Sequence, residues 1–263
     1  MSELMKVDAI ATTTRLALLV RESARFWLRV ATRSGTLGRY HLAGSTVVIH
    51  LRHGTVDLIT LEEIFRLGHY DAPPQVLDAL QASASPLRVV DLGANIGLFG
   101  AFIRRQFPTA RIVAFEPDPA NAAVLRRSIE ANGGDDGWHL VQACAQTADG
   151  EVPFAVYEFT SSRIEAHSAR EIVVPALDVF PFLEDVDLLK IDIEGAEWPI
   201  LADPRFGAGV AKTLALEYHP YGSPEPDARA LALRLLREAG YEITVSDFRL
   251  PPGHGMLWAW RPA

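Results

Sequence analysis

The chain has 263 residues, of which 49% are apolar, and a net charge of −8 at neutral pH. This apolar content can fill the core of one large domain, and an acidic chain without a basic stripe argues against a nucleic-acid partner, whose phosphates require clustered lysines and arginines. The single cysteine, Cys144, excludes an internal disulfide and a cysteine-rich metal site and fits a reducing, cytoplasmic location.

The first 33 residues show a helical pattern. Apolar residues recur at near-helical spacing with arginines between them, namely Leu16, Leu19, Val20, Trp27 and Val30 with Arg15, Arg21, Arg25 and Arg29. This pattern fits an amphipathic helix that packs on its own domain or on the second subunit of a homodimer. It also fits a helix on a membrane surface, but the acidic remainder of the chain favours packing. No apolar run reaches the roughly 18 residues of a membrane span, and no secretory signal is evident.

Residues 40–59 favour two or three short strands with turns at Gly44 and Gly54. Thr60 is predicted to N-cap the next helix, with Glu63 completing a capping box, and Gly68 ends that helix. We therefore predict an N-terminal cap over residues 1–78 and a core domain over residues 79–263. His53, His69 and Tyr70 of this cap could face a pocket, although a structural role is favoured for each.

The core domain opens with a strand, a glycine loop and a helix. Arg88–Leu92 reads as a buried strand with Asp91 near its end, Gly93 and Gly97 follow, and Leu98 begins a helix. Such a loop points backbone N–H groups at whatever lies above the carboxyl end of the strand.

A second strand–helix unit follows and ends its strand in a carboxylate. Residues 110–115 form the strand, and Glu116 comes 23 positions after Gly93. A carboxylate at that tip can accept hydrogen bonds from both ribose hydroxyls. Together with the glycine loop, Glu116 predicts a pocket for an adenosine-type ligand.

The loop sequence narrows the choice of ligand. Asn95 stands where the dinucleotide fingerprint has its second glycine, and Asp91 would repel a phosphate but attract a cation. S-adenosylmethionine, which carries an ammonium and a sulfonium, fits this environment better than a dinucleotide.

Three further strands extend the predicted sheet. Residues 139–144 form a third strand, 187–191 a fourth and 213–217 a fifth, and residues 241–245 and 256–260 close the sheet as an antiparallel pair. Between the third and fourth strands, residues 150–174 suggest two strands around a polar stretch. Its Ser161, Arg163 and His167 could meet a substrate, although a solvated loop is favoured.

Polar residues gather at the carboxyl ends of the fourth and fifth strands. Asp192 and Glu194 follow the fourth strand, and Glu217 and His219 end the fifth. Alternation along an extended chain would place Asp192 and Glu194 on one side, with Lys190. Because the carboxyl ends of parallel strands lie on one edge of a sheet, these residues share a rim with Asp91 and Glu116, and Asp192 and Glu194 lie next to the sulfonium if the strand order reverses between the first and fourth strands.

Four motifs in this order, VVDLGANIG, AFEPDP, LLKIDIEGAEW and LALEYHP, resemble the FkbM family of S-adenosylmethionine-dependent O-methyltransferases. The resemblance implies an α/β fold of the class I methyltransferase (Rossmann-like) type, with a doubly wound, seven-stranded, mostly parallel sheet whose last strand is antiparallel. It also implies that the N-terminal helical and β cap covers the cofactor end, that Ala143 lies at the adenine edge, and that the acceptor is a hydroxyl of a small molecule, a sugar or a secondary metabolite.

The expected site follows from these assignments. Cofactor-binding residues would be Asp91, Gly93, Ala94, Asn95, Gly97, Glu116, Pro117, Asp118, Ala143 and Asp192. Catalysis would fall to His219 as general base with Asp192 and Glu194, or to a divalent ion such as Mg²⁺ held by Asp192, Glu217 and His219. The alternatives are an NAD-dependent Rossmann oxidoreductase and a non-catalytic adenosine-binding module.

Overall fold

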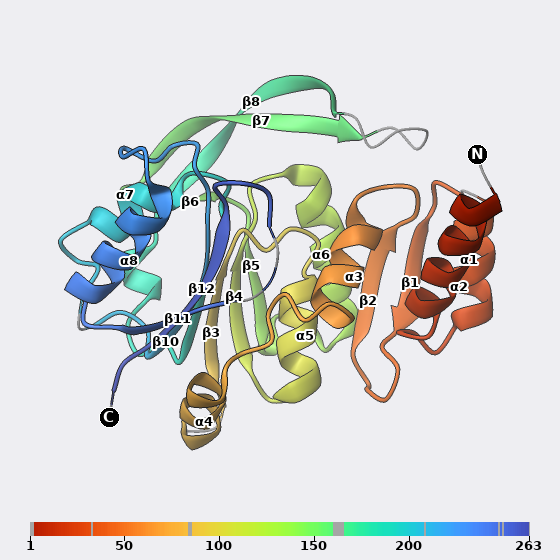
Figure 1. Cartoon of the computed structure of the whole chain (residues 1–263), viewed down its shortest axis with the longest axis horizontal. Coiled ribbons are helices and arrows are strands. Elements are labelled where there is room, and N and C mark those ends of the chain that lie inside the picture. Colours follow the sequence, from red (N-terminus) through yellow and green to blue (C-terminus); the bar gives the residue numbers. More distant parts are fainter. Residues whose placement is uncertain are drawn as a thin grey trace.

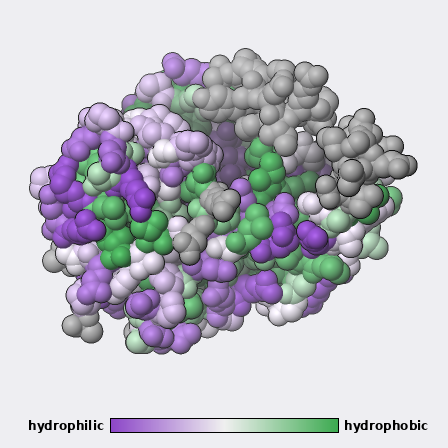
Figure 2. All heavy atoms as spheres, viewed as in Figure 1, coloured by the Kyte–Doolittle hydropathy of each residue, from purple (hydrophilic) through white to green (hydrophobic). Residues whose placement is uncertain are grey.

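The computed structural model describes residues 3–32, 34–83, 86–159, 166–207, 209–246, 248 and 250–262, with backbone alone at residues 3–9, 157–159 and 166–169. Figure 1 shows a cap of helices and two strands beside a central sheet, with a long two-stranded ribbon along the top of the view. On the face drawn in Figure 2, hydrophobic and hydrophilic residues are interspersed. None of the described helices has the length and apolar character needed to cross a membrane.

The central sheet has seven strands in the order β11-β12-β10-β9-β3-β4-β5. Their bounds are β3 (Arg88–Leu92), β4 (Arg111–Phe115), β5 (Trp138–Val141), β9 (Leu188–Ile191), β10 (Thr213–Tyr218), β11 (Glu242–Val245) and β12 (Gly255–Trp260). Strand β12 runs antiparallel to β10 and β11, and the other neighbours pair in parallel. The order reverses at β3, between β4 and β9. The predicted doubly wound sheet with an antiparallel last strand is therefore confirmed.

Helices cover both faces of this sheet. They are α4 (Pro74–Ala82), α5 (Leu98–Gln106), α6 (Pro119–Ala131), α7 (Glu197–Ala202) and α8 (Ala228–Glu238), with short 3-10 turns η1 (Gly134–Asp136) and η2 (Phe180–Phe182). Successive residues of a strand point to opposite faces. Accordingly, Val89 of β3 joins the hydrophobic cluster of α4, α5 and α6, whereas Val90 joins the cluster of α7 and α8.

The cap comprises α1 (Glu3–Ala17), α2 (Ser23–Ala31), β1 (Leu37–His41), β2 (Val48–Arg52) and α3 (Asp57–Phe65). The single helix predicted over residues 1–33 is thus two helices. The interruption has a tertiary cause: Val20 forms an isolated bridge with Leu42, and the N–H of Arg21 donates to the carbonyl of His41. Pairing with β1 therefore overrides the helical periodicity.

Two arginines of α2 lie along the free edge of β1, on either side of the buried Phe26. Arg29 donates to the carbonyl of Leu37 at 3.0 Å, and Arg25 donates to the carbonyl of Arg39. Leu18, Trp27 and Leu28, by contrast, are exposed. This arginine stripe supports packing of the helix on its own domain.

Helix α3 corrects the prediction at Thr60. The helix begins at Asp57, and Thr60 lies inside it with its hydroxyl donating to the carbonyl of Val56. The earlier start is stabilised by Asp57, whose buried carboxylate accepts hydrogen bonds from the backbone and side chain of Arg52, and by Thr55, whose hydroxyl accepts the N–H of Asp57.

The third predicted strand is also shorter than expected. Strand β5 ends at Val141, and Cys144 begins β6 (Cys144–Gln146) in a separate sheet with β7 (Gly150–Phe159) and β8 (Ala166–Asp178), in the order β6-β8-β7. Strands β7 and β8 form the ribbon in Figure 1. Ser161 and Arg163 lie outside the described residues, as does the side chain of His167.

Cap and core share one hydrophobic cluster, which joins Phe26 and Leu51 of the cap to Leu98 and Trp138 of the core. The boundary predicted at residue 78 falls within α4. It stays a prediction.

A buried histidine of the cap is expected to reduce stability in acid. His53 is 1% exposed, its Nε2 lies 2.8 Å from the hydroxyl of Tyr40, and its ring packs edge-on against Phe26. Burial lowers the pKa of His53 from its ordinary 6.5 to about 4. Below pH 6.5 the unfolded chain therefore takes up a proton that the folded chain refuses, and stability is lost as pH falls towards 4.

We expect His53 to lower the free energy of unfolding by about 2 kcal/mol between pH 7.5 and pH 5. His53→Gln should remove this part of the pH dependence, which urea unfolding at the two pH values measures. The matched control is His139→Gln, because His139 is exposed. A His53→Gln variant that keeps the full wild-type pH dependence would contradict the assignment.

Candidate active site

The predicted glycine loop joins β3 to α5 and presses against the end of β9. Gly93 and Gly97 adopt left-handed backbone conformations with φ of 81° and 87°. A Cβ atom at Gly93 would lie 1.8 Å from the carbonyl oxygen of Asp192. Only glycine fits this position, because both the backbone angle and the close approach exclude a side chain.

Several backbone N–H groups of this loop donate to acceptors at the end of β4, whereas the sequence predicted that they point into the space above the carboxyl end of β3. Gly93 and Ala94 both donate to the carbonyl of Phe115, at 3.1 and 2.8 Å. Asn95 donates its backbone N–H to Oε2 of Glu116 at 2.7 Å. The loop and the predicted ribose-binding carboxylate are therefore parts of one hydrogen-bonded unit.

Glu116 is 5% exposed and also accepts the N–H of Asp118 at 2.8 Å. Burial raises the pKa of Glu116 to about 7, although the hydrogen bonds from Asp118 and Asn95 oppose this rise. The neighbouring Asp118 caps α6 by accepting the N–H groups of Ala120 and Asn121. Asp118 is thus tied to the helix, whereas Glu116 sits at the strand tip as predicted.

Asp91 and Lys190 form a buried ion pair beneath the loop. The Nζ of Lys190 lies 3.1 Å from Oδ1 of Asp91 and donates to the carbonyl of Gly93 at 2.7 Å. Burial raises the pKa of Asp91, and Lys190 opposes the rise. For Lys190 itself, burial lowers the pKa, but Asp91 and Asp192 reverse that effect and raise it overall. The sequence predicted that Asp91 faces a cationic ligand, but it did not predict that the ammonium group of Lys190 pairs with this carboxylate.

Asp192 connects this ion pair to the cap. Its Oδ2 lies 3.4 Å from Nζ of Lys190 and accepts a hydrogen bond from the hydroxyl of Tyr70 at 3.1 Å. The phenol of Tyr70 comes from a segment 122 positions away in sequence, so no local pattern could have predicted the contact.

His219 is buried and oriented by Glu197. Its Nδ1 lies 3.2 Å from Oε1 of Glu197, which also accepts the backbone N–H of His219 at 2.7 Å. The Nε2 atom faces Oε2 of Glu194 at 3.4 Å and Oε1 of Glu217 at 3.8 Å. Burial alone would lower the pKa of His219, but the hydrogen bond to Glu197 and the charge of Glu194 raise it overall.

Glu197 was not among the predicted site residues. It lies in the motif KIDIEGAEW and is fully buried at the start of a helix. Its Oε2 accepts the N–H of Gly195. The sequence signal that could have identified Glu197 was an ionisable residue in the first turn of a buried helix.

Asp192 and Glu194 meet through a turn rather than through strand alternation. Strand β9 ends at Ile191, and Glu194 has a left-handed φ of 55°. The turn nonetheless leaves one ligand atom each of Asp192, Glu194 and His219 within 4.8 Å of one another. Asp192 and Glu194 therefore lie close together as predicted, but the prediction that an extended chain brings them together is wrong.

Glu217 points towards the cap. Its Oε2 lies 3.0 Å from Nε2 of His69, and both residues are buried. We call Asp192, Glu194, Glu217 and His219 the tip cluster. Lys190 links this cluster to the nucleoside group, which comprises Asp91, Gly93, Asn95 and Glu116. The predicted Pro117 follows Glu116 directly, and Ala143 is buried just beyond β5.

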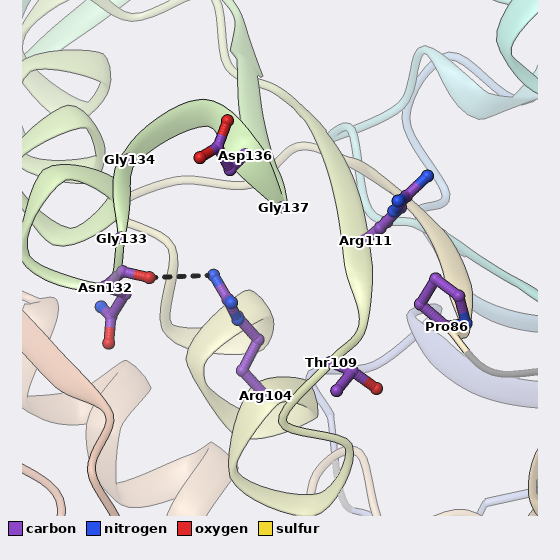
Figure 3. Close-up of a pocket in the computed structure, with 9 residues that line it drawn as sticks. All are labelled: Pro86, Arg104, Thr109, Arg111, Asn132, Gly133, Gly134, Asp136 and Gly137. Atoms are coloured by element: carbon purple, nitrogen blue, oxygen red, sulfur yellow. Dashed lines mark hydrogen bonds between the residues drawn. The ribbon is translucent and has the colours of Figure 1, made fainter.

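A separate cavity lies at the opposite end of the sheet. It has a volume of about 380 Å³ and is lined by Arg104, Arg111, Asn132 and the backbone of the following glycines. Figure 3 shows Arg104 directed at the carbonyl of Asn132, to which it donates at 3.3 Å. This cavity contains none of the predicted site residues.

Residues 91–243, more than half of the chain, match the family described as the Methyltransferase FkbM domain. The chain is 28% identical to methyltransferase sdnD of Sordaria araneosa, over 59% of this chain and 74% of that protein. It is 27% identical to methyltransferase 1 of Beauveria bassiana, over 53% of this chain and 64% of that protein.

A third relative is much longer than this chain. The AMB antimetabolite synthetase AmbE of Pseudomonas aeruginosa is 31% identical over 63% of this chain but only 10% of its own length. Among solved structures, the precorrin-6y C5,15-methyltransferase of Geobacter metallireducens has 16% identity and a TM-score of 0.44, over 71% of this chain and 86% of that one.

Gly93 provides a direct test of the contact between the loop and β9. We expect Gly93→Ala to lower the free energy of unfolding by about 3 kcal/mol or more, because the methyl group would meet the carbonyl of Asp192 in a left-handed conformation. Urea unfolding measures the loss. Gly207→Ala is the control, since no atom lies within 4 Å of a Cβ there, and equal stability of the two variants would refute the close approach.

Proposed function

The chain belongs to the FkbM methyltransferase family, and on this premise we propose that it transfers the methyl group of S-adenosylmethionine to a hydroxyl oxygen of a small-molecule or glycosyl acceptor. One observation carries the proposal: the nucleoside group and the tip cluster lie at the same edge of the sheet, joined by Lys190. In doubly wound sheets, ligands bind at this edge, where the strand order reverses.

The residues of the nucleoside group suit the donor. Oδ1 of Asp91 faces Lys190 at 3.1 Å, but Oδ2 of Asp91 and Oδ1 of Asn95 have no hydrogen-bond partner among the described residues. Buried polar atoms are rarely left in this state, so these atoms favour a polar ligand. Glu116 would hold the ribose hydroxyls, and Asp91 and Asp192 would face the cationic part. When bound, S-adenosylmethionine supplies a methyl group on a positively charged sulfur.

The tip cluster supports proton removal from the acceptor. An alcohol is a weak nucleophile near neutral pH, so it requires a base. Nδ1 of His219 lies 3.2 Å from Glu197, which as a carboxylate favours the neutral tautomer with the proton on Nδ1. In that tautomer Nε2 carries the lone pair, and this nitrogen is where the hydroxyl proton would be held. Asp192 and Glu194 would orient the acceptor hydroxyl beside Nε2.

Metal-assisted transfer is the second candidate. The ligand atoms of Asp192, Glu194 and His219 are close enough to share one ion, and Mg²⁺ favours carboxylate oxygens. Such an ion would lower the pKa of the bound hydroxyl. Glu217, the predicted third ligand, instead faces His69. The acceptor class, the exclusion of nucleic acids, the homodimer and the cytoplasmic location all stay predictions.

His219 distinguishes the two mechanisms from an inert binding module. We expect His219→Ala to reduce turnover by about 100-fold or more while S-adenosylhomocysteine still binds, as measured by methyl gain in mass spectrometry and by calorimetry. His139→Ala is the control. Turnover that disappears on dialysis against a chelator and returns with Mg²⁺ would favour the metal, and unchanged turnover in His219→Ala would exclude both roles.

Glu116 makes adenosyl-ligand binding dependent on pH. Because its pKa is about 7 without ligand and the ionised form is the better acceptor for ribose hydroxyls, affinity should fall as pH drops. We expect the Kd of S-adenosylhomocysteine to rise up to tenfold per pH unit below about pH 7. Calorimetry between pH 5.5 and 8 measures this rise.

Glu116→Gln should bind more weakly at pH 8 and show a flat profile. A wild-type Kd that does not change between pH 5.5 and 8 would contradict the role of Glu116. NAD serves as the comparison ligand, and tighter binding of NAD than of S-adenosylhomocysteine would instead favour the oxidoreductase alternative.

A further inference from the structure

The segment between α3 and α4, residues 66–73, lies against the tip cluster although it belongs to the cap. We call it the arm. His69 and Tyr70 of the arm are 6% and 3% exposed. Each contacts one carboxylate of the cluster: Tyr70 donates its hydroxyl to Asp192 at 3.1 Å, and Nε2 of His69 lies 3.0 Å from Glu217.

Aromatic stacking fixes the arm in this position. The ring of His69 is parallel to the rings of Tyr70 and Phe248, at centroid distances of 4.5 and 4.2 Å. At these distances the rings of Tyr70 and Phe248 must lie on opposite faces of the His69 ring, because both would not fit on one face. Tyr70 also meets Phe99 of α5 edge-on at 4.9 Å. The hydroxyl of Tyr70 is therefore presented to Asp192 by a ring that contacts aromatic residues of the cap and α5.

The contact continues from Asp192 to the glycine loop. Oδ2 of Asp192 accepts from Tyr70 and also faces Lys190, whose Nζ donates to the carbonyl of Gly93. Tyr70, Asp192, Lys190 and Gly93 thus form a continuous chain of polar contacts. Among the described residues, removal of the Tyr70 hydroxyl would leave Lys190 as the remaining hydrogen-bond or ion-pair partner of the Asp192 carboxylate, which could then turn towards that ammonium.

We propose that Tyr70 is a positioning residue of the adenosyl-ligand site, which it serves by holding Asp192 in its binding orientation. The inference rests on the proposed function, because that function assigns Asp192 to the ligand. The cap is then part of the site rather than a cover over it. By thermodynamic linkage, the ligand stabilises the docked arm as much as the docked arm strengthens binding.

Three tyrosine variants test this inference. In Tyr70→Phe the ring remains and the hydroxyl is lost. Tyr241→Phe removes a buried hydroxyl that donates to the carbonyl of Ala211 in the core, and Tyr40→Phe removes the one that contacts His53 in the cap. Each of the three variants loses one hydrogen bond of a buried tyrosine, but of the three hydroxyls only that of Tyr70 contacts a residue of the proposed adenosyl-ligand site.

We expect Tyr70→Phe to raise the Kd of S-adenosylhomocysteine by about 5- to 30-fold in calorimetry, and the two control variants to change it less than twofold. Wild-type affinity in Tyr70→Phe would overturn the inference. Absence of S-adenosylhomocysteine binding in the wild type would overturn the proposed function and this inference with it, so the two failures are distinguishable.

A double-mutant cycle separates positioning from general loss of packing. If Tyr70 acts through Asp192, Tyr70→Phe should have little effect on Kd in an Asp192→Asn background. Additive losses in the double variant would overturn the proposed route even if Tyr70→Phe alone binds weakly. This comparison also remains informative if Tyr70→Phe loses stability, because binding is compared among variants at temperatures where each is folded.

Discussion

The buried ammonium group of Lys190 is the interaction on which the site depends. It is held between Asp91 of β3 at 3.1 Å and Asp192, which follows the adjacent strand β9, at 3.4 Å, and it donates to the carbonyl of Gly93. Removing an ion from water costs several kcal/mol unless its partners are well placed. The ends of β3 and β9 and the glycine loop are therefore constrained to one relative arrangement, because a shift of any of them would leave a buried charge without its partner.

Lys190 lies between two parts of the site at this edge of the sheet, the nucleoside group and the tip cluster. On one side, the loop and Glu116 share hydrogen bonds and form the proposed nucleoside pocket. On the other, Glu197 fixes the imidazole of His219 so that Nε2 faces the carboxylates of the tip cluster. Methyl transfer requires donor and acceptor to be aligned, and the shared lysine keeps the two parts at a fixed separation.

The sequence predicted what depends on local pattern and missed what depends on distant contacts. The strand, glycine loop and helix at Gly93 and the acidic tip at Glu116 follow from periodicity and motif spacing, and the structure confirms them. The doubly wound sheet, which the resemblance to the FkbM family implied, is confirmed as well. The helix start at Thr60 was wrong because the buried Asp57 begins the helix a turn earlier. The contact of Tyr70, which the sequence favoured as a structural residue, with Asp192 and that of Glu197 with His219 were not predicted, because the partners lie 122 and 22 positions away.

The arginine stripe of α2 has a consequence for assembly. A strand with a free edge can recruit a strand from another molecule, which is a common route to aggregation. Along β1, the carbonyls of Leu37, Arg39 and His41 are already occupied by donors from Arg29, Arg25 and Arg21. The cap's two-stranded sheet is thus closed to extension along β1, and any pairing of two such molecules there must use side chains rather than a shared ladder.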